Sequence, residues 1–331
     1  RNPWQAPTPE WAMLTPPPPY NFASLPSVAG REPLADDPAL GARLARGEGY
    51  LDDAGRGRRE TLAVDTVSGR IDHVVVLPGN TRLPFVTAAI TGAFFVAMLA
   101  KAYWLTPFVL AGVVVLGWRW AWTLGGREDL GPVPIGRGES AITHPEAREA
   151  PGWLGSTFTL VADASLFVSL LFGAAYLWIV TPGTRSVLPP PASAWEPLAG
   201  VAGACLAVAG ARAMLRACKG GGVPRIGGAL GLACAGLASL AVALSASMAL
   251  RSPADASAHA LGATHAVLGA YALVHVGIAA LMTAFVAARY RAGFVSAARQ
   301  LEPRVARQWV DYAAAAGGAS LLAMHLPGWL A

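Results

Sequence analysis

The stretch Ser156–Val180 has the sequence STFTLVADASLFVSLLFGAAYLWIV, with one acidic residue, Asp163, and no basic residue. A helix needs about 20 apolar residues to cross the hydrocarbon core of a bilayer, where it must pair its own backbone polar groups. This stretch is long and apolar enough for one crossing. It therefore predicts a membrane-spanning helix that carries a carboxylate inside it.

Six further stretches have the same character, so the sequence predicts an all-α membrane protein with seven transmembrane helices. Hydrophobic residues make up 54% of the 331 residues and charged residues only 14%, which lies outside the usual range of soluble domains. The second stretch contains Arg119, whose long side chain can reach the headgroups from near a helix end. The expected helices are approximately Leu83–Trp104, Pro107–Leu124, Ser156–Val180, Pro197–Arg216, Gly227–Leu250, Leu261–Arg289 and Gln308–Leu330.

The basic residues predict the orientation of these helices. Of the 25 Lys and Arg residues, 21 lie in four segments that would share one side of the membrane, namely 1–82, 125–151, 212–225 and 289–307. Short loops rich in Lys and Arg stay in the cytoplasm. We therefore expect a cytoplasmic N-terminal tail and a C-terminus outside. This placement explains the net charge of +5, and we expect no nucleic-acid partner.

Two polar segments lie before and between the expected helices. Residues 30–82 are rich in Gly, Asp and Arg, and the alternation Ile71–Val76 predicts one short strand or hairpin within a solvated linker. The segment Gly125–Pro151 is likewise polar and predicts a loop.

The first residues, RNPWQAPTPEWAMLTPPPPYNF, are unlike the rest of the chain. The run Asn2–Phe22 resembles the cytoplasmic tail that closes subunit I of haem-copper respiratory oxidases, where N-P-W-x-A-x-T-L-E-W leads into S-P-P-P-x-x-N-F. Pro9 stands where that family usually has Leu, and Thr15 where it usually has Ser. Because the match is already under way at Arg1, we expect the chain to be a fragment that begins where the catalytic subunit ends.

The helices that follow resemble subunit III of the same oxidases, in the same order. Asp163 takes the place of a Glu embedded in the family's third helix. His275, fourteen residues before Arg289, resembles the second His of the family's H-x-x-H-V helix. Gln308–Asp311 resembles the W-H-F-V-D that opens its last helix. The whole chain thus resembles the junction of a fused subunit I/III of cytochrome c oxidase, with a tail at 1–29, a linker at 30–82 and a subunit III-like domain of two plus five helices at 83–331.

The resemblance implies part of a terminal oxidase of a bacterial plasma membrane, which couples oxygen reduction to proton translocation. Haem and copper would be bound by histidines upstream of Arg1, so we expect no redox centre or metal in this part and no catalysis by it alone. Its six histidines never fall at i, i+3 or i, i+4, the spacing that places ligands on one helix face. The implied partners are subunits I and II, membrane phospholipid, and cytochrome c as donor.

Three residues are candidates for sustaining proton uptake or for docking helices: Asp163, His275 and Asp311. A charged side chain inside a membrane helix costs about 2.5 to 3.5 kcal/mol on insertion scales, so it usually faces protein or water and has a partner. The alternative for Asp163 is a hydrogen-bonded carboxyl that fixes a helix contact. The alternative for His275, which shares a helix face with Tyr271, is a structural hydrogen bond between helices.

Arginines near the expected cytoplasmic boundary are candidates for binding lipid phosphate, because a guanidinium pairs with phosphate oxygens bidentately. The residues we select are Arg225, Arg289 and Arg291. The plainer interpretation is that such residues only set the topology.

Two other functions remain open. A quinol oxidase of the same superfamily would have a very similar subunit I tail. An unrelated transporter or membrane anchor is also possible, but it leaves the run Asn2–Phe22 unexplained, and a transporter would be expected to have broken helices or inverted repeats.

Overall fold

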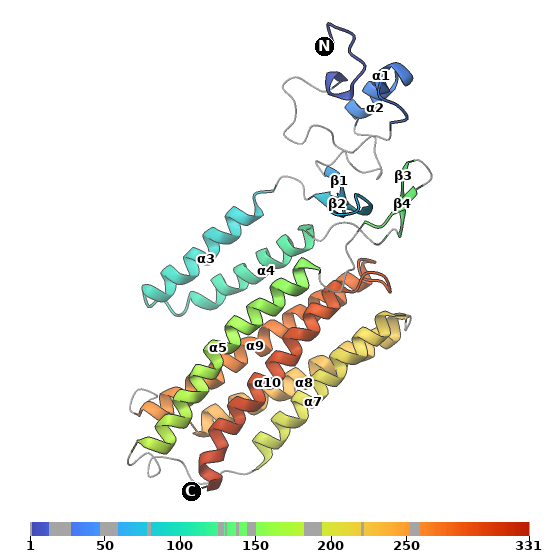
Figure 1. Cartoon of the computed structure of the whole chain (residues 1–331). Coiled ribbons are helices and arrows are strands. Elements are labelled where there is room, and N and C mark those ends of the chain that lie inside the picture. The colour runs from blue at the N-terminus through green and yellow to red at the C-terminus, as the bar shows by residue number, and fades with distance from the viewer. Residues whose placement is uncertain are drawn as a thin grey trace. The chain divides into compact units, whose positions relative to one another are not determined.

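The structure is a computed structural model in which each of the seven predicted stretches lies largely within a helix. It describes residues 2–12, 28–46, 59–77, 81–124, 129, 131–136, 139–143, 150–181, 194–219, 222–251 and 259–330. The chain divides into two compact units, Arg1–Pro145 and Glu146–Ala331, each described by itself below (Figure 1). Among the described residues, five helices are long and apolar enough to cross a membrane. An all-α membrane protein is therefore confirmed at this level.

The first unit begins with short helical segments. A 3-10 helix, η1 (Pro9–Ala12), is followed by α1 (Pro33–Asp36) and α2 (Leu40–Arg46). The backbone N–H of Leu34 donates to the carbonyl of Pro7 over 2.8 Å, which ties α1 to the chain before η1. Residues 13–27, which include the proline run of the predicted tail, lie outside the described residues.

Two small hairpins follow, and they pack together. Strand β1 (Arg59–Val64) pairs antiparallel with β2 (Ile71–Leu77), which confirms the predicted hairpin. Within the polar segment predicted as a loop, β3 (Val133–Gly136) pairs with β4 (Glu139–Ala141). The N–H of Val74 donates to the carbonyl of Ile142 over 2.7 Å. Val74, Val133, Ile135 and Ala141 form one buried cluster, so these hairpins make a small folded body, where the sequence predicted a solvated linker.

An antiparallel helix pair completes the first unit. Helix α3 (Leu83–Leu99) and α4 (Thr106–Leu124) lie side by side. The chain reverses at Lys101, whose φ is +56°, so α3 ends before Trp104, where the sequence analysis placed its end. With 17 residues, α3 is about 25 Å long at 1.5 Å per residue, shorter than the roughly 30 Å of a hydrocarbon core.

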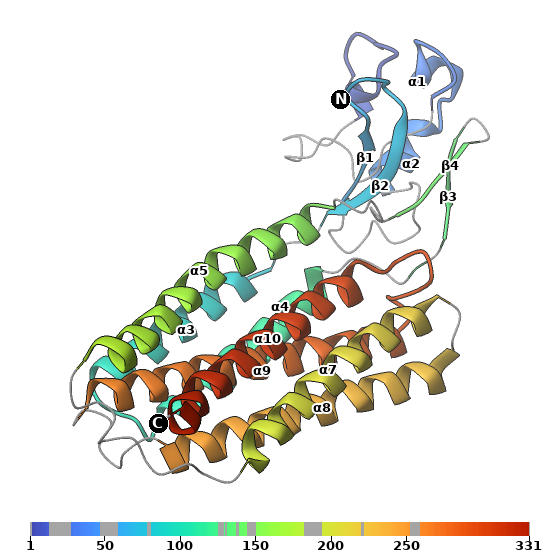
Figure 2. The same ribbon diagram turned by 60° about the horizontal axis from the view of Figure 1, so that its bottom comes forward.

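The second unit is a bundle of five helices. They are α5 (Pro151–Val180), α7 (Trp195–Cys218), α8 (Gly222–Arg251), α9 (Ala260–Arg291) and α10 (Leu301–Leu330). Helix α10 contacts the other four helices, whereas α5 packs substantially only against α9 and α10. Figures 1 and 2 both show α7 and α8 running together along one side of this bundle.

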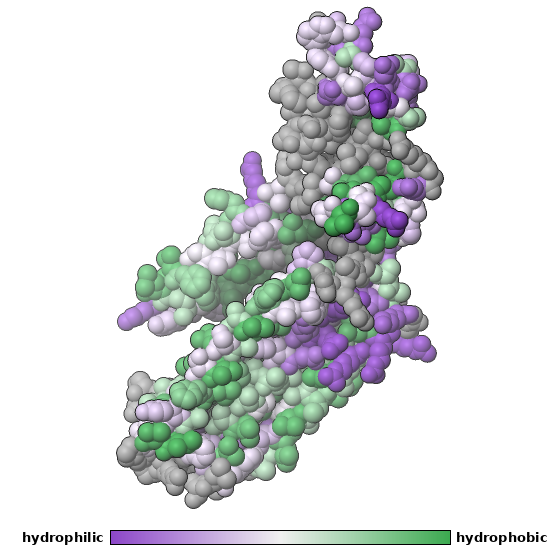
Figure 3. All heavy atoms as spheres, viewed as in Figure 1, coloured by the Kyte–Doolittle hydropathy of each residue, from purple (hydrophilic) through white to green (hydrophobic). Residues whose placement is uncertain are grey.

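The main core of the bundle lies between α7, α8, α9 and α10 and is built largely from small side chains. Its fully buried members include Ala207, Ala243, Ala272 and Ala313, with leucines such as Leu240 filling the wider spaces. Small residues allow helix backbones to approach closely. Helices in lipid associate by such packing, because lipid tails are as apolar as the helices and the hydrophobic effect does not drive the helices together. Figure 3 shows the apolar side chains spread along the helices.

Candidate functional site

The carboxylate predicted inside the membrane lies at the meeting point of three helices. Asp163 comes from α5, Tyr271 and His275 come from one face of α9, and Tyr312 comes from α10. Tyr271 and His275 share a face because they are one helical turn apart. The side chain of Asp163 is 27% exposed and that of His275 only 9%, so the group lies largely inside the bundle.

Three donor groups converge on a single oxygen of Asp163. The hydroxyl of Tyr312 donates to Oδ2 over 2.7 Å, and the hydroxyl of Tyr271 donates to the same oxygen. Nε2 of His275 lies 3.0 Å from it. The two tyrosine oxygens are themselves 2.5 Å apart. Because each hydroxyl carries a single hydrogen, that hydrogen points either to Oδ2 or to the other tyrosine. An acidic group in a membrane helix needs such partners because water is not there to solvate it.

The hydrogen bonds of His275 determine how many protons this group holds. Nδ1 of His275 lies 2.8 Å from the backbone carbonyl of Tyr271, which can only accept, so Nδ1 carries a hydrogen. The contact between Nε2 and Asp163 then contains one proton. It lies either on the carboxyl, beside a neutral imidazole, or on the imidazole, beside a carboxylate. Both arrangements are neutral overall, which makes burial of the pair in an apolar bundle less costly.

Further polar contacts join α5 to α10 nearer the start of each helix. Nε2 of Gln308 donates to the hydroxyl of Thr157 over 2.9 Å, and Nε1 of Trp309 donates to the hydroxyl of Ser156 over 3.1 Å. The ring of Trp309 also lies nearly parallel to that of His275, with 6.4 Å between centroids. We call these contacts, together with those of Asp163, the polar seam. It extends over Ser156–Asp163 of α5, about 10 Å along the helix.

The structure brings together two of the three residues predicted for proton uptake or helix docking. Asp163 and His275 are in contact, whereas Asp311 forms an i, i+4 ion pair with Arg307, with 3.1 Å between Oδ2 and Nε. The residue that reaches Asp163 from α10 is the next one along, Tyr312. The sequence analysis missed Tyr312, although the face shared by Gln308 and Tyr312, four residues apart, was a usable signal.

The three arginines predicted to bind lipid phosphate have different surroundings. Arg289 is fully buried at the end of α9 and forms an ion pair with Glu302 of α10 at 2.7 Å, with its guanidinium 3.9 Å from the centre of the Phe294 ring. Arg225 and Arg291 are exposed near the ends of α8 and α9. Lipid binding by these residues stays a prediction, and for Arg289 the structure adds a role in joining α9 to α10.

Comparison with models of protein families and with curated proteins finds no match to this chain. The resemblance to oxidase subunits therefore rests on the quoted sequence motifs alone and stays a prediction. Among the described residues, no His, Cys, Asp and Glu side chains gather into a group of three that could hold a metal ion. The prediction that haem and copper belong to an upstream part of a parent chain stays a prediction.

Proposed function

We propose that this chain is the C-terminal part of a cytochrome c oxidase subunit I/III fusion and that it supports the catalytic subunit without a redox centre of its own. The observation that carries the proposal is the environment of Asp163: an intramembrane carboxyl in contact with His275. These two residues match an acid and a histidine of the subunit III pattern. They lie on α5 and α9, the helices that resemble the family's third helix and its H-x-x-H-V helix.

Two further observations support the proposal. The run Asn2–Phe22 resembles the tail of subunit I, and the chain divides into a unit with two apolar helices and a unit with five. In the proposed arrangement α3 and α10 also cross the membrane, which gives seven spans. The N-terminal tail lies in the cytoplasm of a bacterium and the C-terminus outside. Subunits I and II and phospholipid are the partners, and cytochrome c is the electron donor to the complex.

In this proposal the shared proton is the functional feature of the polar seam. A carboxyl and an imidazole can exchange one proton between them without creating net charge in the bundle, because both forms of the pair are neutral. To pass the proton to another group and stay neutral, the pair must take up a second proton as the first one leaves. The chain would thereby help to sustain proton uptake by the catalytic subunit during turnover. The second candidate role is helix docking, which the convergence of α5, α9 and α10 on one oxygen favours.

The two roles are separated by replacing Asp163 with Asn and with Leu in the assembled oxidase. An Asn side chain still accepts hydrogen bonds from Tyr271 and Tyr312 but cannot carry the proton, whereas Leu can do neither. If proton uptake is the role, both variants should inactivate several-fold faster during turnover than the parent enzyme. If docking is the role, Asn should behave like the parent and only Leu should inactivate.

The control is Ser165→Ala, which removes an exposed hydroxyl that bonds only to the carbonyl of Ala162 on the same helix. Activity decay is followed by oxygen consumption with reduced cytochrome c, beside a reduced-minus-oxidised spectrum that reports whether haem is present. Unchanged decay in both Asp163 variants would overturn a functional role for this carboxyl. A purified complex without haem would overturn the oxidase assignment.

A further inference from the structure

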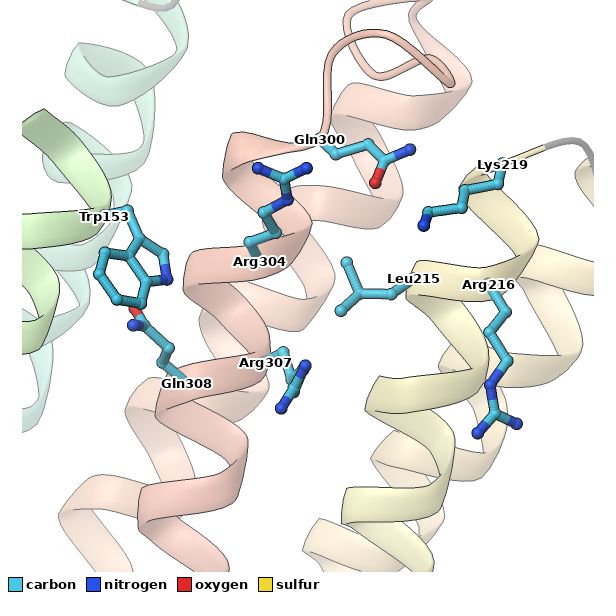
Figure 4. Close-up of a pocket in the computed structure, with 8 residues that line it drawn as sticks. All are labelled: Trp153, Leu215, Arg216, Lys219, Gln300, Arg304, Arg307 and Gln308. Atoms are coloured by element: carbon cyan, nitrogen blue, oxygen red, sulfur yellow. The ribbon is translucent and has the colours of Figure 1, made fainter. Parts of the chain in front are cut away.

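A basic pocket lies in the five-helix unit, outside the group around Asp163. It has a volume of about 670 Å³ and is lined by four cationic side chains, Arg216 and Lys219 from the end of α7 and Arg304 and Arg307 from the start of α10. Trp153 of α5 and Gln308 of α10 also line it. Figure 4 shows the lining side chains along α10, with Trp153 and Gln308 on one side of this helix and Arg216 and Lys219 of α7 on the other. Pockets of roughly 300 to 1,000 Å³ are typical of sites for small ligands.

The described part of the chain offers little compensation for the positive charge of this pocket. Of the four cations, only Arg307 has a carboxylate partner among the described residues, the ion pair with Asp311. Among the residues that the structure describes, no acidic one lines the pocket. Figure 3 shows the same concentration of hydrophilic side chains where α7 ends and α10 begins. Like charges held this close repel one another, so an anion between them would lower the free energy of the folded bundle.

The two ends of the pocket differ in how well their helices tolerate cations. Arg216 and Lys219 lie at the C-terminal end of α7, where a positive side chain is stabilised by the helix dipole. Arg304, however, lies within the first turns of α10, which begins at Leu301. Cations are unfavourable at that end because the helix dipole is positive there. The helix dipole and the preference of basic residues for the cytoplasmic side therefore account for the cations of α7 better than for those of α10.

We infer that this pocket binds a phosphate-bearing anion. Arginine guanidinium groups match phosphate oxygens bidentately, and a lysine ammonium adds a point charge. Trp153 provides an aromatic wall, and Oε1 of Gln308 has no hydrogen-bond partner among the described residues. The phosphate can come from an anionic phospholipid headgroup or from a soluble phosphate compound. The site involves neither Asp163 nor His275, so it stands or falls separately from the oxidase proposal.

The test uses the full chain in detergent micelles and two probes, phosphatidylglycerol and inorganic phosphate. Lipid binding is measured by native mass spectrometry, with phosphatidylcholine of the same acyl chains as the uncharged control. Phosphate binding is measured by isothermal titration at constant ionic strength. The pocket variant combines Lys219→Gln with Arg304→Gln. The control variant combines Lys101→Gln with Arg70→Gln, which removes the same charge and the same residue types from exposed positions that do not line the pocket.

We expect the pocket variant to bind at least one of the two probes roughly tenfold or more weakly than the parent chain, while the control variant binds like the parent. A loss confined to phosphatidylglycerol identifies a lipid headgroup as the ligand. A loss confined to inorganic phosphate identifies a soluble phosphate compound. Lys219→Gln alone, at an exposed position just past α7, should show a smaller loss in the same direction and should not affect folding. Equal affinities for both probes in the pocket and control variants would overturn the inference.

Discussion

Two interfaces inside the five-helix unit hold their helices together by different physical means. The contact between α7 and α8 brings glycine and alanine backbones together: a Cβ at Gly203 would lie 2.8 Å from the carbonyl oxygen of Gly236. The polar seam instead joins α5, α9 and α10 through side-chain hydrogen bonds centred on Asp163. The first interface depends on shape and excludes added volume. The second depends on donors and acceptors, so it should be most sensitive to losing a polar atom.

The largest expected effect is on the shape-dependent interface. A Cβ at Gly210 of α7 would lie 2.7 Å from the Cα of Ala233 and 2.9 Å from the carbonyl oxygen of Ala229, and neither backbone atom can move without displacing α8. Gly210→Leu should therefore lower the free energy of unfolding by about 3 kcal/mol or more. The measurement is unfolding by sodium dodecyl sulfate in mixed micelles.

The matched control for that prediction is Gly231→Leu on α8, because a Cβ there meets no atom within 4 Å. This substitution should leave the unfolding midpoint close to that of the parent chain. Equal losses at positions 210 and 231 would show that the close approach of α7 and α8 is not what limits side-chain size.

Removing the ion pair between α9 and α10 should have an effect on stability of intermediate size. The fully buried guanidinium of Arg289 pairs with Glu302. Glu302→Ala should destabilise the bundle by roughly 2 kcal/mol, below the range for fully buried pairs because the Glu302 side chain is 25% exposed. The same unfolding assay measures it, with the exposed Arg291→Gln as a control that should have little effect. Unchanged stability in the Glu302 variant would mean that water or another group replaces the carboxylate at no cost.

A smaller effect is expected from removing one hydroxyl of the polar seam. Tyr312→Phe keeps the ring but deletes the 2.7 Å hydrogen bond to Asp163, so it should cost about 1 kcal/mol of unfolding free energy. Tyr176→Phe on α5, where the side chain is exposed, is the matched control and should cost less. If the two variants lose the same amount, the hydrogen bonds at Asp163 do not hold α10 to α5.

The smallest effect lies outside the bundle, at the β1–β2 turn. Backbone N–H groups of Ser68 and Val67 donate to the Asp65 carboxylate and hold its pKa below the ordinary value of 3.8. Because the pKa is lowered in the folded state, this stabilisation is present above pH 3.8 and is lost as the pH falls through the folded pKa. The amide NMR shifts of Val67 and Ser68 should titrate in that acidic range in the parent chain. They should not do so in Asp65→Asn; a titration that persists in the variant would assign it to another group.

The sequence predicted the fold more completely than it predicted the candidate site. Each predicted apolar stretch lies largely within a helix, and five of these helices are candidate membrane spans among the described residues. Such spans are visible in the local sequence because lipid requires each one to satisfy its own backbone. The helix ends were less accurate, as at α3, where the chain turns at Lys101 before the apolar stretch is over. The pairing of β3 and β4 within a polar segment was missed because those strands have only four and three residues, and because Val74, which packs against them, is distant in sequence.

At the site, the sequence identified Asp163 and His275 as residues that need partners but did not identify all of those partners. Asp311 was selected from its position in a short pattern, whereas the neighbouring Tyr312 contacts Asp163. The basic pocket could not be predicted because its cations come from the end of one helix and the start of another, more than eighty residues away.

Thus the sequence alone determined that this chain forms apolar helices, approximately where they lie, and that one of them carries a carboxyl group. These properties depend on runs of neighbouring residues and on the solvation of single groups. Only the tertiary structure decided that Asp163 meets two tyrosines and a histidine, that Arg289 is buried against Glu302, and that α7 and α10 bring four cations together. Those arrangements depend on how far each helix is rotated about its axis and shifted along its neighbours, which is set by packing between residues distant in the chain.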